Sequence, residues 1–399
     1  MNRIIAKEKC TGCSICSIIC ARKAISMRED YYGFMYPYID QNKCIDCEKC
    51  INVCPENMEN NKNQPIQCLA AQGENEQVLL NCASGGAFYY IAKSFIENGG
   101  TVFGCKMSIN GNSTDISHIR VSDVDQLREI IGSKYAQSDS YKCFVDIQKE
   151  LISGNKVLFA STPCQVAALK SFLSKDFDNL LTIDIFCHGN TNRRLLSDYI
   201  RYLGQKEGSD IIQYVFRDKQ RGKGYKAKYK TAKSNEWRRI TTYQEAYWYL
   251  FQNAKILRVS CYGCRYASQK RVGDLSLGDF WGIEKTRPDI VKSDNAVIDN
   301  KYGISAILIN SQKGLMLFND TSGLKTVVCN VNDISKYGHA ICKPTLKPND
   351  RETILADYTN YGYGYIQKQY KKVLGIRYYK YYIREIPVIE RLITILRSR

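Results

Sequence analysis

The central part of the chain alternates short apolar segments with amphipathic ones. The segments with the length and composition of buried strands are 101–107, 116–121, 156–160, 180–186 and 304–309. The segments whose apolar positions recur at helical spacing are 87–98, 123–131, 141–153, 165–173 and 312–319. Because strands that alternate with helices tend to form parallel pairs, we predict an α/β domain with a mostly parallel sheet.

Two flanking regions have other patterns. Residues 211–217, 225–231 and 237–242 alternate apolar with polar positions, which predicts a small antiparallel patch, and the aromatic-rich residues 244–254 predict a helix. Before the α/β region, the polar and Asn-rich residues 56–67 predict a linker. The linker separates a short N-terminal domain from the α/β domain.

One strand–helix–strand unit brings two cysteines together. Strand 156–160 is followed by a turn that ends at Cys164, by helix 165–173 and by strand 180–186, after which comes Cys187. A crossover of this length joins two parallel strands. Both cysteines then lie at C-terminal strand ends on one edge of the sheet, where open α/β sheets bind ligands.

The N-terminal domain contains two cysteine runs of identical spacing. Each run reads C-x2-C-x2-C-x3-C, and 23 residues separate the two. Their members are Cys10, Cys13, Cys16, Cys20 and Cys44, Cys47, Cys50, Cys54. Three thiolates at this spacing bind one 4Fe–4S cluster, and the fourth cysteine of each run binds the other cluster. We therefore predict that Cys54 joins the first three cysteines and that Cys20 joins Cys44, Cys47 and Cys50.

A pair of structural zinc sites is the alternative for these runs. Zinc sites usually combine two separated cysteine pairs and do not need three cysteines at successive x2 spacings. Residues 1–60 resemble bacterial two-cluster ferredoxins, except that Ala21 stands where a proline often follows the fourth cysteine. The fold class predicted for the whole chain is an α+β ferredoxin-like dicluster domain over 1–65, followed over 66–330 by the α/β domain with its antiparallel patch. Residues 331–399 form a C-terminal extension.

A further cysteine pair, Cys261 and Cys264, has C-x2-C spacing. Alone it is ambiguous between zinc, a redox dithiol and half of a cluster site. Beside Cys164 and Cys187 it would supply the two missing ligands of a third 4Fe–4S cluster, and the spacing leaves this open. The other six cysteines look isolated and are expected to be packing residues or idle thiols: Cys68, Cys82, Cys105, Cys143, Cys329 and Cys342.

Composition and charge narrow the class of protein. With 399 residues, 44% of them hydrophobic, the chain can build a substantial core, and it has no apolar run of 18 residues that would span a membrane. A ligand cysteine at position 10 leaves no room for a signal peptide, so we expect a cytoplasmic protein with reduced thiols. The formal charge of +17 is accompanied by no nucleic-acid motif, so we do not predict nucleic-acid binding.

The basic residues gather at the C-terminus. Residues 366–399 hold nine Lys or Arg against Glu385 and Glu390. A basic amphipathic helix is predicted after Pro387. Two interpretations stay open for it: packing on its own domain, or contact with a partner or with an anionic membrane surface on the inner side of the cell membrane.

Dispersed motifs over residues 82–320 resemble the coenzyme F420 hydrogenase/dehydrogenase beta-subunit family. The motifs are Ser84-Gly85-Gly86, Gly132-Ser133-Lys134-Tyr135, Thr162-Pro163-Cys164-Gln165, Cys187-His188-Gly189, Cys261-Tyr262-Gly263-Cys264 and Gly278-Asp279-Phe280-Trp281-Gly282. The resemblance implies an FAD and a 4Fe–4S cluster that exchange electrons, and it favours the third cluster at Cys164, Cys187, Cys261 and Cys264. It also makes the glycine-rich turns candidate flavin contacts.

The candidate flavin contacts are Ser84, Gly85, Gly86, Lys134, Thr162, Gly278 and Asp279. Lys134 is a candidate for stabilising anionic reduced flavin. His188 is a candidate proton shuttle near the flavin, with hydrogen bonding beside a cluster sulfur as the alternative role.

Together these patterns predict an iron–sulfur flavoprotein oxidoreductase. It would couple a two-electron donor or acceptor, such as coenzyme F420, to one-electron carriers through three clusters. The expected partners are a small-molecule electron donor or acceptor and a redox protein, either a ferredoxin or a catalytic subunit. The alternatives are an electron-transfer subunit without a substrate of its own and a membrane-surface accessory protein docked to a partner enzyme.

Overall fold

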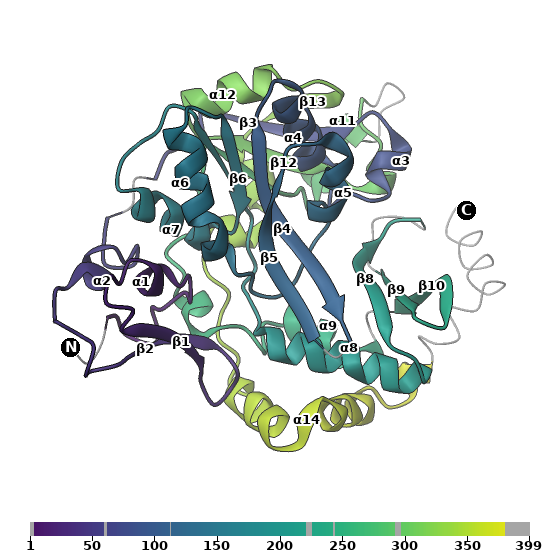
Figure 1. Cartoon of the computed structure of the whole chain (residues 1–399). Helices are drawn as coiled ribbons and strands as arrows, with labels where there is room; N and C mark the ends of the chain where they lie inside the picture. The colour runs from purple at the N-terminus through teal and green to yellow at the C-terminus, as the bar shows by residue number, and fades with distance from the viewer. Residues whose placement is uncertain are drawn as a thin grey trace.

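The computed structural model describes residues 4–59, 62–111, 113–220, 226–241, 244–291 and 297–379. The N-terminal residues form a small lobe beside a larger domain built on one sheet (Figure 1). In the lobe, strands β1 (Ile25–Glu29) and β2 (Met35–Ile39) pair antiparallel, and the short helices α1 (Ile15–Ile18) and α2 (Lys49–Asn52) contact each other. Each helix follows closely on the first cysteines of its run.

The large sheet has eight strands in the order β13-β3-β12-β11-β7-β6-β4-β5. In that order the strands are Leu324–Cys329, Gln67–Gly73, Ser305–Ile309, Leu275–Asp279, Leu180–Ile185, Val157–Ser161, Thr101–Asn110 and Ser113–Val121. The strands β11, β7, β6 and β4 pair parallel with one another in this order, and all other neighbouring strands pair antiparallel. The predicted parallel sheet is therefore confirmed for its centre, whereas both flanks are antiparallel.

Helices cover both faces of this sheet, because side chains of a strand alternate between faces. On β6, Val157 and Phe159 pack with helices α6 (Phe144–Ile152) and α7 (Pro163–Leu173). Leu158 faces the other side, with α4 (Ala87–Glu97), α5 (Leu127–Ile130) and α12 (Gln312–Asn319). The other helices are α3 (Glu76–Leu79), α8 (Arg193–Glu207), α9 (Ala246–Gln252), α10 (Ile283–Thr286), α11 (Pro288–Val291), α13 (Val331–Ser335) and α14 (Arg351–Leu374).

Two features of the sheet were not expected from the sequence. Strand β3 begins at Gln67, where the predicted linker ends, and it lies between β12 and β13. Its sequence QCLAAQG lacks the β-branched and aromatic residues that mark strands, and only pairing on both sides makes it one. Cys164 also differs from expectation: it lies in the first turn of α7 and not in the turn before it.

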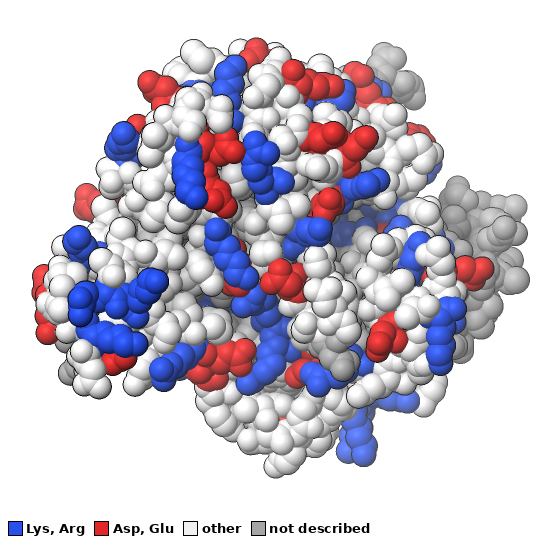
Figure 2. Space-filling model, in the orientation of Figure 1, with Lys and Arg blue, Asp and Glu red and all other residues white. Residues whose placement is uncertain are grey.

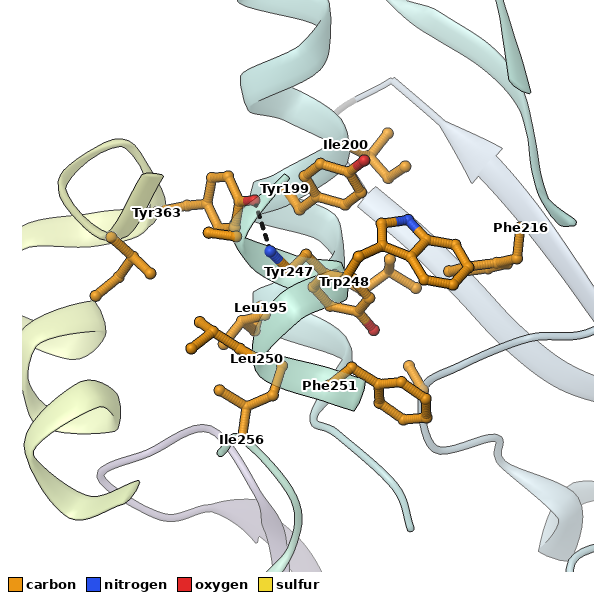
Figure 3. Packing of buried hydrophobic residues seen from close by; sticks show 14 of the residues in the cluster. Leu195, Tyr199, Ile200, Phe216, Tyr247, Trp248, Leu250, Phe251, Ile256 and Tyr363 are labelled. Atoms are coloured by element: carbon orange, nitrogen blue, oxygen red, sulfur yellow. Dashed lines mark hydrogen bonds between the residues drawn. The ribbon is translucent and has the colours of Figure 1, made fainter. Parts of the chain in front are cut away.

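The antiparallel patch is confirmed as a separate sheet in the order β10-β9-β8. Its strands are Ser234–Thr241, Lys226–Thr231 and Ile211–Asp218. An aromatic core lies next to this sheet and is formed with α8, α9 and α14 (Figure 3). Within it the rings of Tyr199 and Tyr247 are stacked 5.2 Å apart, and the Tyr247 N–H donates to the Tyr363 hydroxyl at 3.1 Å.

Glu245 lies buried at the start of α9 beside this aromatic core. Its side chain is 2% exposed, and its Oε2 atom has no hydrogen-bond partner among the described residues. Burial raises the pKa of Glu245 to about 7, with Lys206 acting weakly in the opposite direction. The folded protein therefore holds a proton on Glu245 at pH values where the unfolded chain has lost it.

This difference predicts a pH effect on stability. Since the folded state binds the extra proton between about pH 4.5 and pH 7, the free energy of unfolding falls as the pH rises through that window. We expect Glu245→Gln to remove this dependence and to stabilise the protein by roughly 3 kcal/mol at pH 8 but little at pH 5. Denaturant unfolding at both pH values measures it, and equal effects of the substitution at the two pH values would contradict it.

Basic and acidic side chains are interspersed over the face shown in Figure 2. In the described part of the chain, no helix combines the length and apolar character needed to cross a bilayer. The basic helix predicted after Pro387 lies outside the described residues. The domain boundaries predicted at residues 65 and 330 stay predictions; α14, beyond the second boundary, packs its Leu355 and Tyr358 into the aromatic core.

Candidate functional site

The N-terminal lobe brings cysteines of its two runs close together. Cys13 and Cys16 both lie close enough to Cys10 and Cys54 for their charges to act on one another. In the second group, Cys20 and Cys44 act in the same way on Cys50. Cys54, the fourth cysteine of the second run, thus lies near the first three of the first run, and Cys20 lies near Cys44 and Cys50. Cys47, which the spacing assigns to the second group, is exposed to solvent.

Four further cysteines, all in the large domain, line one cavity of about 220 Å³. Cys164 comes from the start of α7, Cys187 follows β7, and the other two come from a 3-10 turn at Val259–Gly263 and the residue after it, Cys264. Because β6 and β7 are parallel neighbours, the residues after their C-terminal ends meet at one sheet edge. The turn that carries Cys261 and Cys264 closes the cavity from another side.

The chemistry of this cavity fits a cluster. The Asn190 N–H donates to Cys261 Sγ at 3.4 Å, and backbone N–H groups of Gly189, Tyr266 and Ala267 donate to the sulfurs of Cys187 and Cys264. Burial raises the pKa of the Cys261 thiol to about 11, so a bound metal has to displace its proton. The N–H donors would then stabilise the thiolate form.

No three His, Cys, Asp or Glu side chains in the described ranges converge on one point as ligands of a single metal ion. A 4Fe–4S cluster does not require such convergence, because each thiolate binds a different iron of the cube.

A buried ion pair holds the Cys264 segment against the sheet. Arg271 and Asp184 are 1% and 0% exposed, and the Arg271 Nε donates to Asp184 Oδ1 at 3.1 Å. The Asp184 Oδ2 accepts from the Gly273 N–H at 2.9 Å, and the Arg271 Nη1 donates to the Tyr266 carbonyl at 3.0 Å. Asp184 belongs to β7, which ends just before Cys187, so this pair fixes Cys264 relative to Cys187.

The N-terminal lobe forms part of the same cavity wall. Lys9, Thr11 and Glu56 of the lobe line it together with the four cysteines. Helix α1 packs on α7, and the Ser171 hydroxyl of α7 donates to the Val53 carbonyl at 2.6 Å. Glu56 acts on Cys10 and Cys54 from one side and on Cys264 from the other. The group containing Cys10 and Cys54 is therefore a direct neighbour of the cavity.

Comparisons with known proteins identify the family. Residues 154–334 match the family model for the C terminus of the beta subunit of coenzyme F420 hydrogenase/dehydrogenase, and residues 9–58 match a 4Fe–4S dicluster domain. Residues 154–334 thus belong to the coenzyme F420 hydrogenase/dehydrogenase beta-subunit family, and residues 9–58 form a dicluster ferredoxin domain. The dicluster match assigns iron–sulfur clusters to the N-terminal lobe of this beta-subunit homologue.

Two individual proteins are similar to this chain, one over a short part of it and the other over most of it. An uncharacterized ferredoxin of Methanocaldococcus jannaschii is 35% identical over 54 residues, which are 14% of this chain and 69% of the ferredoxin. A chain from the F420-reducing NiFe hydrogenase complex of Methanosarcina barkeri superimposes with a TM-score of 0.43 at 15% identity, covering 80% of this chain and 97% of that chain.

In this beta-subunit homologue, the Ser84-Gly85-Gly86 turn packs tightly at the start of α4. A Cβ on Gly85 would lie 2.2 Å from the Ala71 carbonyl oxygen, so a side chain does not fit there. The Gly85 N–H donates to Ser305 Oγ at 2.9 Å and the Gly86 N–H to the Ala83 carbonyl at 3.0 Å. These two N–H groups are already used within the protein, so the glycines serve close packing in the first place.

Two cationic side chains that the sequence analysis did not single out lie at this turn. The Lys219 ammonium donates to the Ser84 carbonyl, and Lys219 is fully buried. Burial lowers the pKa of Lys219 to about 8, and the charge of Arg217 adds to the shift. Arg217 makes two hydrogen bonds, at 2.9 and 2.7 Å, to the predicted site residue Asp279. Arg217 is the last but one residue of strand β8, and Lys219 follows the strand directly. Their place at a strand end was the only sign in the sequence that they belong to a site.

Of the other predicted flavin contacts, Gly278 lies beside the Ser84 turn, whereas Thr162 and Lys134 make other contacts. The Gly278 carbonyl is 3.4 Å from the Ser84 hydroxyl, and a Cβ on Gly278 would lie 2.0 Å from the Phe186 ring. Thr162 lies at the cysteine cavity, with its Oγ1 3.4 Å from Cys164 Sγ. Lys134 is partly buried, donates to the Ile130 and Ile131 carbonyls at 3.0 and 2.8 Å, and has its pKa lowered to about 8 by loss of hydration.

His188 lies on the cavity wall with its ring held by α9. Its Nε2 is 3.1 Å from the Phe251 carbonyl, so Nε2 carries the hydrogen in this bond. Burial lowers the pKa of His188, which favours the neutral ring. The ring also packs against Phe251 at 5.3 Å. The imidazole is thus fixed beside Cys187 as a neutral group.

Proposed function

We propose that this chain is an iron–sulfur flavoprotein oxidoreductase that relays electrons between an FAD and three 4Fe–4S clusters. It would couple a two-electron donor or acceptor, such as coenzyme F420, to one-electron carriers. A bound flavin supplies the exchange between two-electron and one-electron chemistry. The observation that carries the proposal is the cavity lined by four cysteines of the large domain and by residues of the ferredoxin lobe.

The third cluster would be held by Cys164, Cys187, Cys261 and Cys264. Their thiols come from three separate elements, surround one cavity and act on one another electrostatically. Backbone N–H groups point at three of these sulfurs or lie within hydrogen-bond distance of them, and such bonds tune the potential of a cluster. The position of this cavity beside the lobe supports a role for the third cluster as the link between the large domain and the cluster predicted at Cys10, Cys13, Cys16 and Cys54.

The flavin would lie near Lys219, Arg217 and Asp279. Lys219 is buried, its hydrogen-bond acceptor in the described chain is the Ser84 carbonyl, and the nearby Asp279 carboxylate is already paired with Arg217. A buried ammonium in these surroundings suits a phosphate. The Ser84 turn would contribute through its carbonyl and through close packing, because the N–H groups of Gly85 and Gly86 are already engaged. Lys134, held by α5 carbonyls, is the weaker candidate for a flavin contact.

Packed aromatic residues connect the two proposed cofactor positions. Tyr135 lies next to Arg217 and Asp279, whose charges act on its hydroxyl. Its ring packs against Phe251 at 4.8 Å, and Phe251 packs against His188 on the cysteine cavity. Close packing of these rings would exclude water between a flavin and a third cluster bound at these positions. His188 would act there as a neutral hydrogen-bonding residue, since its Nε2–H is committed to α9.

The exposure of Cys47, one of the predicted ligands with Cys20, Cys44 and Cys50, favours a second function. This function is that of an electron-transfer subunit docked to a catalytic partner. Cys47 is exposed, and the neighbouring Ile45 has 63% of its surface accessible. An exposed apolar residue beside an exposed cluster ligand is what a transient redox partner would cover. Both functions use the same relay and differ in whether a small molecule reacts at the flavin.

The proposal is tested by counting cofactors after anaerobic purification. We expect about twelve irons, with matching sulfide, and one FAD per chain. About eight irons without flavin would refute the relay. Steady-state assays with reduced coenzyme F420, NAD(P)H and reduced ferredoxin then decide between the two functions: turnover of a small molecule without a partner supports the oxidoreductase.

Lys219 gives a more specific prediction for the flavin. We expect Lys219→Met to weaken FAD binding by about 10- to 100-fold, because a charge-assisted bond in a buried site contributes about 1.5–3 kcal/mol. Fluorescence titration of flavin-free protein with FAD measures it. Lys233→Met is the control, since Lys233 is an exposed lysine at the turn between β9 and β10. Unchanged FAD affinity in Lys219→Met would place the flavin elsewhere.

A further inference from the structure

Arg258 is a buried cation between two neighbouring cysteine sets. One set lines the cavity of the large domain, and the other is the lobe set of Cys10, Cys13, Cys16 and Cys54. Arg258 is 1% exposed and lines the cavity of Cys164, Cys187, Cys261 and Cys264. Its backbone starts the turn that carries Cys261, since the Cys261 N–H donates to the Arg258 carbonyl at 3.0 Å. Its side chain leaves that turn and reaches into the ferredoxin lobe.

The guanidinium holds the lobe by its backbone. Its Nη1 donates to the Cys10 carbonyl at 3.1 Å and its Nη2 to the Met35 carbonyl at 2.6 Å. The third contact, from Nε to Gln137 Oε1 at 3.1 Å, connects it to a side chain that itself donates to the Thr11 and Gly12 carbonyls. A Cβ on Gly12 would lie 2.4 Å from Nη2, so glycine is required for this approach.

All these partners are neutral. No carboxylate of the described residues lies within ion-pair distance of Arg258, in contrast to Arg271, which is paired with Asp184, and Arg351, which is paired with Glu352. The rings of Phe34 and Tyr36 lie 5.5 and 4.6 Å from its guanidinium carbon. A buried positive charge without a counter-charge is costly, and hydrogen bonds to carbonyls do not neutralise it.

The charge of Arg258 acts on a thiol of each set. It favours the thiolate of Cys10 in the lobe and the thiolate of Cys261 at the cavity. Glu56 acts on the same region with the opposite sign, and Arg351 adds to the effect on Cys261 alone. Arg258 is thus a fully buried cation that acts on both sets and has no carboxylate partner among the described residues, whereas Lys9 and Arg265, which also line the cavity, are not among the buried residues.

We propose that Arg258 is the shared counter-charge of the two adjacent clusters and sets the reduction potentials of both. This inference rests on the proposed third cluster. A cluster with four thiolates carries about −2 when oxidised and gains one more negative charge on reduction, so a fixed buried cation stabilises the reduced form. Arg258 therefore keeps both neighbouring clusters reducible while it fixes the Cys10 loop against the Cys261 turn. It acts as a positioning and tuning residue.

The test uses the full-length protein with its clusters, purified without oxygen. Redox titration followed by electron paramagnetic resonance gives the potential of each cluster. We expect Arg258→Gln to lower the one-electron reduction constant of two of the three clusters by at least tenfold, which is about 59 mV for a one-electron couple. The cluster of Cys20, Cys44, Cys47 and Cys50 should keep its potential.

Two further variants separate charge from structure. Arg258→Lys loses the forked hydrogen bonds but keeps the charge, so both potentials should stay within about threefold of the wild-type reduction constant. Arg194→Gln removes another arginine between the lobe and the large domain, which pairs with Glu29 at 3.1 Å, and should change no potential. The inference is overturned if Arg258→Gln leaves both potentials unchanged, or if Arg258→Lys shifts them as far as Arg258→Gln does.

Iron content keeps this test distinct from that of the proposed function. A wild-type protein with about eight irons would refute the third cluster itself. If Arg258→Gln fails to retain its clusters, the loaded Arg258→Lys protein decides: wild-type potentials support the inference, and a tenfold shift overturns it.

Discussion

Replacement of Cys261 by alanine is expected to lower the iron content from about twelve to about eight atoms per chain. Cys261 contributes one of four thiolates at the cavity, and its sulfur accepts the Asn190 N–H at 3.4 Å. A cubic cluster left with three protein thiolates would be lost during purification. The two clusters of the lobe are predicted to use other cysteines and should stay. Iron and sulfide analysis, together with loss of one paramagnetic signal on reduction, measures the effect.

The matched control for this prediction is Cys329→Ala. Cys329 is also buried, but it lies on the edge strand β13 and belongs to neither the lobe nor the cavity. Its removal should leave about twelve irons in place. If both cysteine variants retain the same iron content, the third cluster does not use Cys261.

The second large effect is expected from Asp184→Asn. This change leaves the Arg271 guanidinium buried at 1% exposure without its counter-charge, and it takes away one acceptor for the Gly273 N–H. Removing one partner of a buried pair costs about 3–5 kcal/mol. We expect a loss of this size in the free energy of unfolding, and a loss of third-cluster iron, because the pair fixes Cys264 relative to Cys187.

Denaturant unfolding monitored by circular dichroism gives the free-energy change. The control is Glu97→Gln, which breaks the exposed helical pair of Lys93 and Glu97, 3.3 Å apart, and should cost less than about 0.5 kcal/mol. A similar small cost for Asp184→Asn would mean that the Arg271 contacts to the Tyr266 and Ile185 carbonyls suffice to hold the segment.

Much of the fold could be predicted from the local pattern of the chain. Helix α4 and strand β12 begin and end within one or two residues of the predicted segments, because each has a period that a short window detects. The β6–α7–β7 crossover is local as well, so the proximity of Cys164 and Cys187 followed from topology. Strand β3 could not be found this way, since its Ala-rich sequence becomes a strand only between β12 and β13.

The candidate site divides in the same manner. Cysteine spacing alone predicted the two N-terminal ligand groups, because cluster geometry is imposed on residues only two or three apart. The cationic residues Arg217, Lys219 and Arg258 were not predicted, since what distinguishes them is burial and the lack or presence of a charged partner. Charge on a side chain is visible in a sequence, but desolvation of that charge is not.

The sequence by itself determined the dicluster domain, the crossover and the family resemblance, because each depends on residue type at short, fixed spacing. Only the tertiary structure decided that the ferredoxin lobe closes the cavity of Cys164, Cys187, Cys261 and Cys264. That contact joins residues far apart in the chain, such as Arg258 and Cys10, 3.1 Å from guanidinium to carbonyl. Such proximity depends on how two folded units pack, which is a property of their complementary surfaces and not of any local pattern.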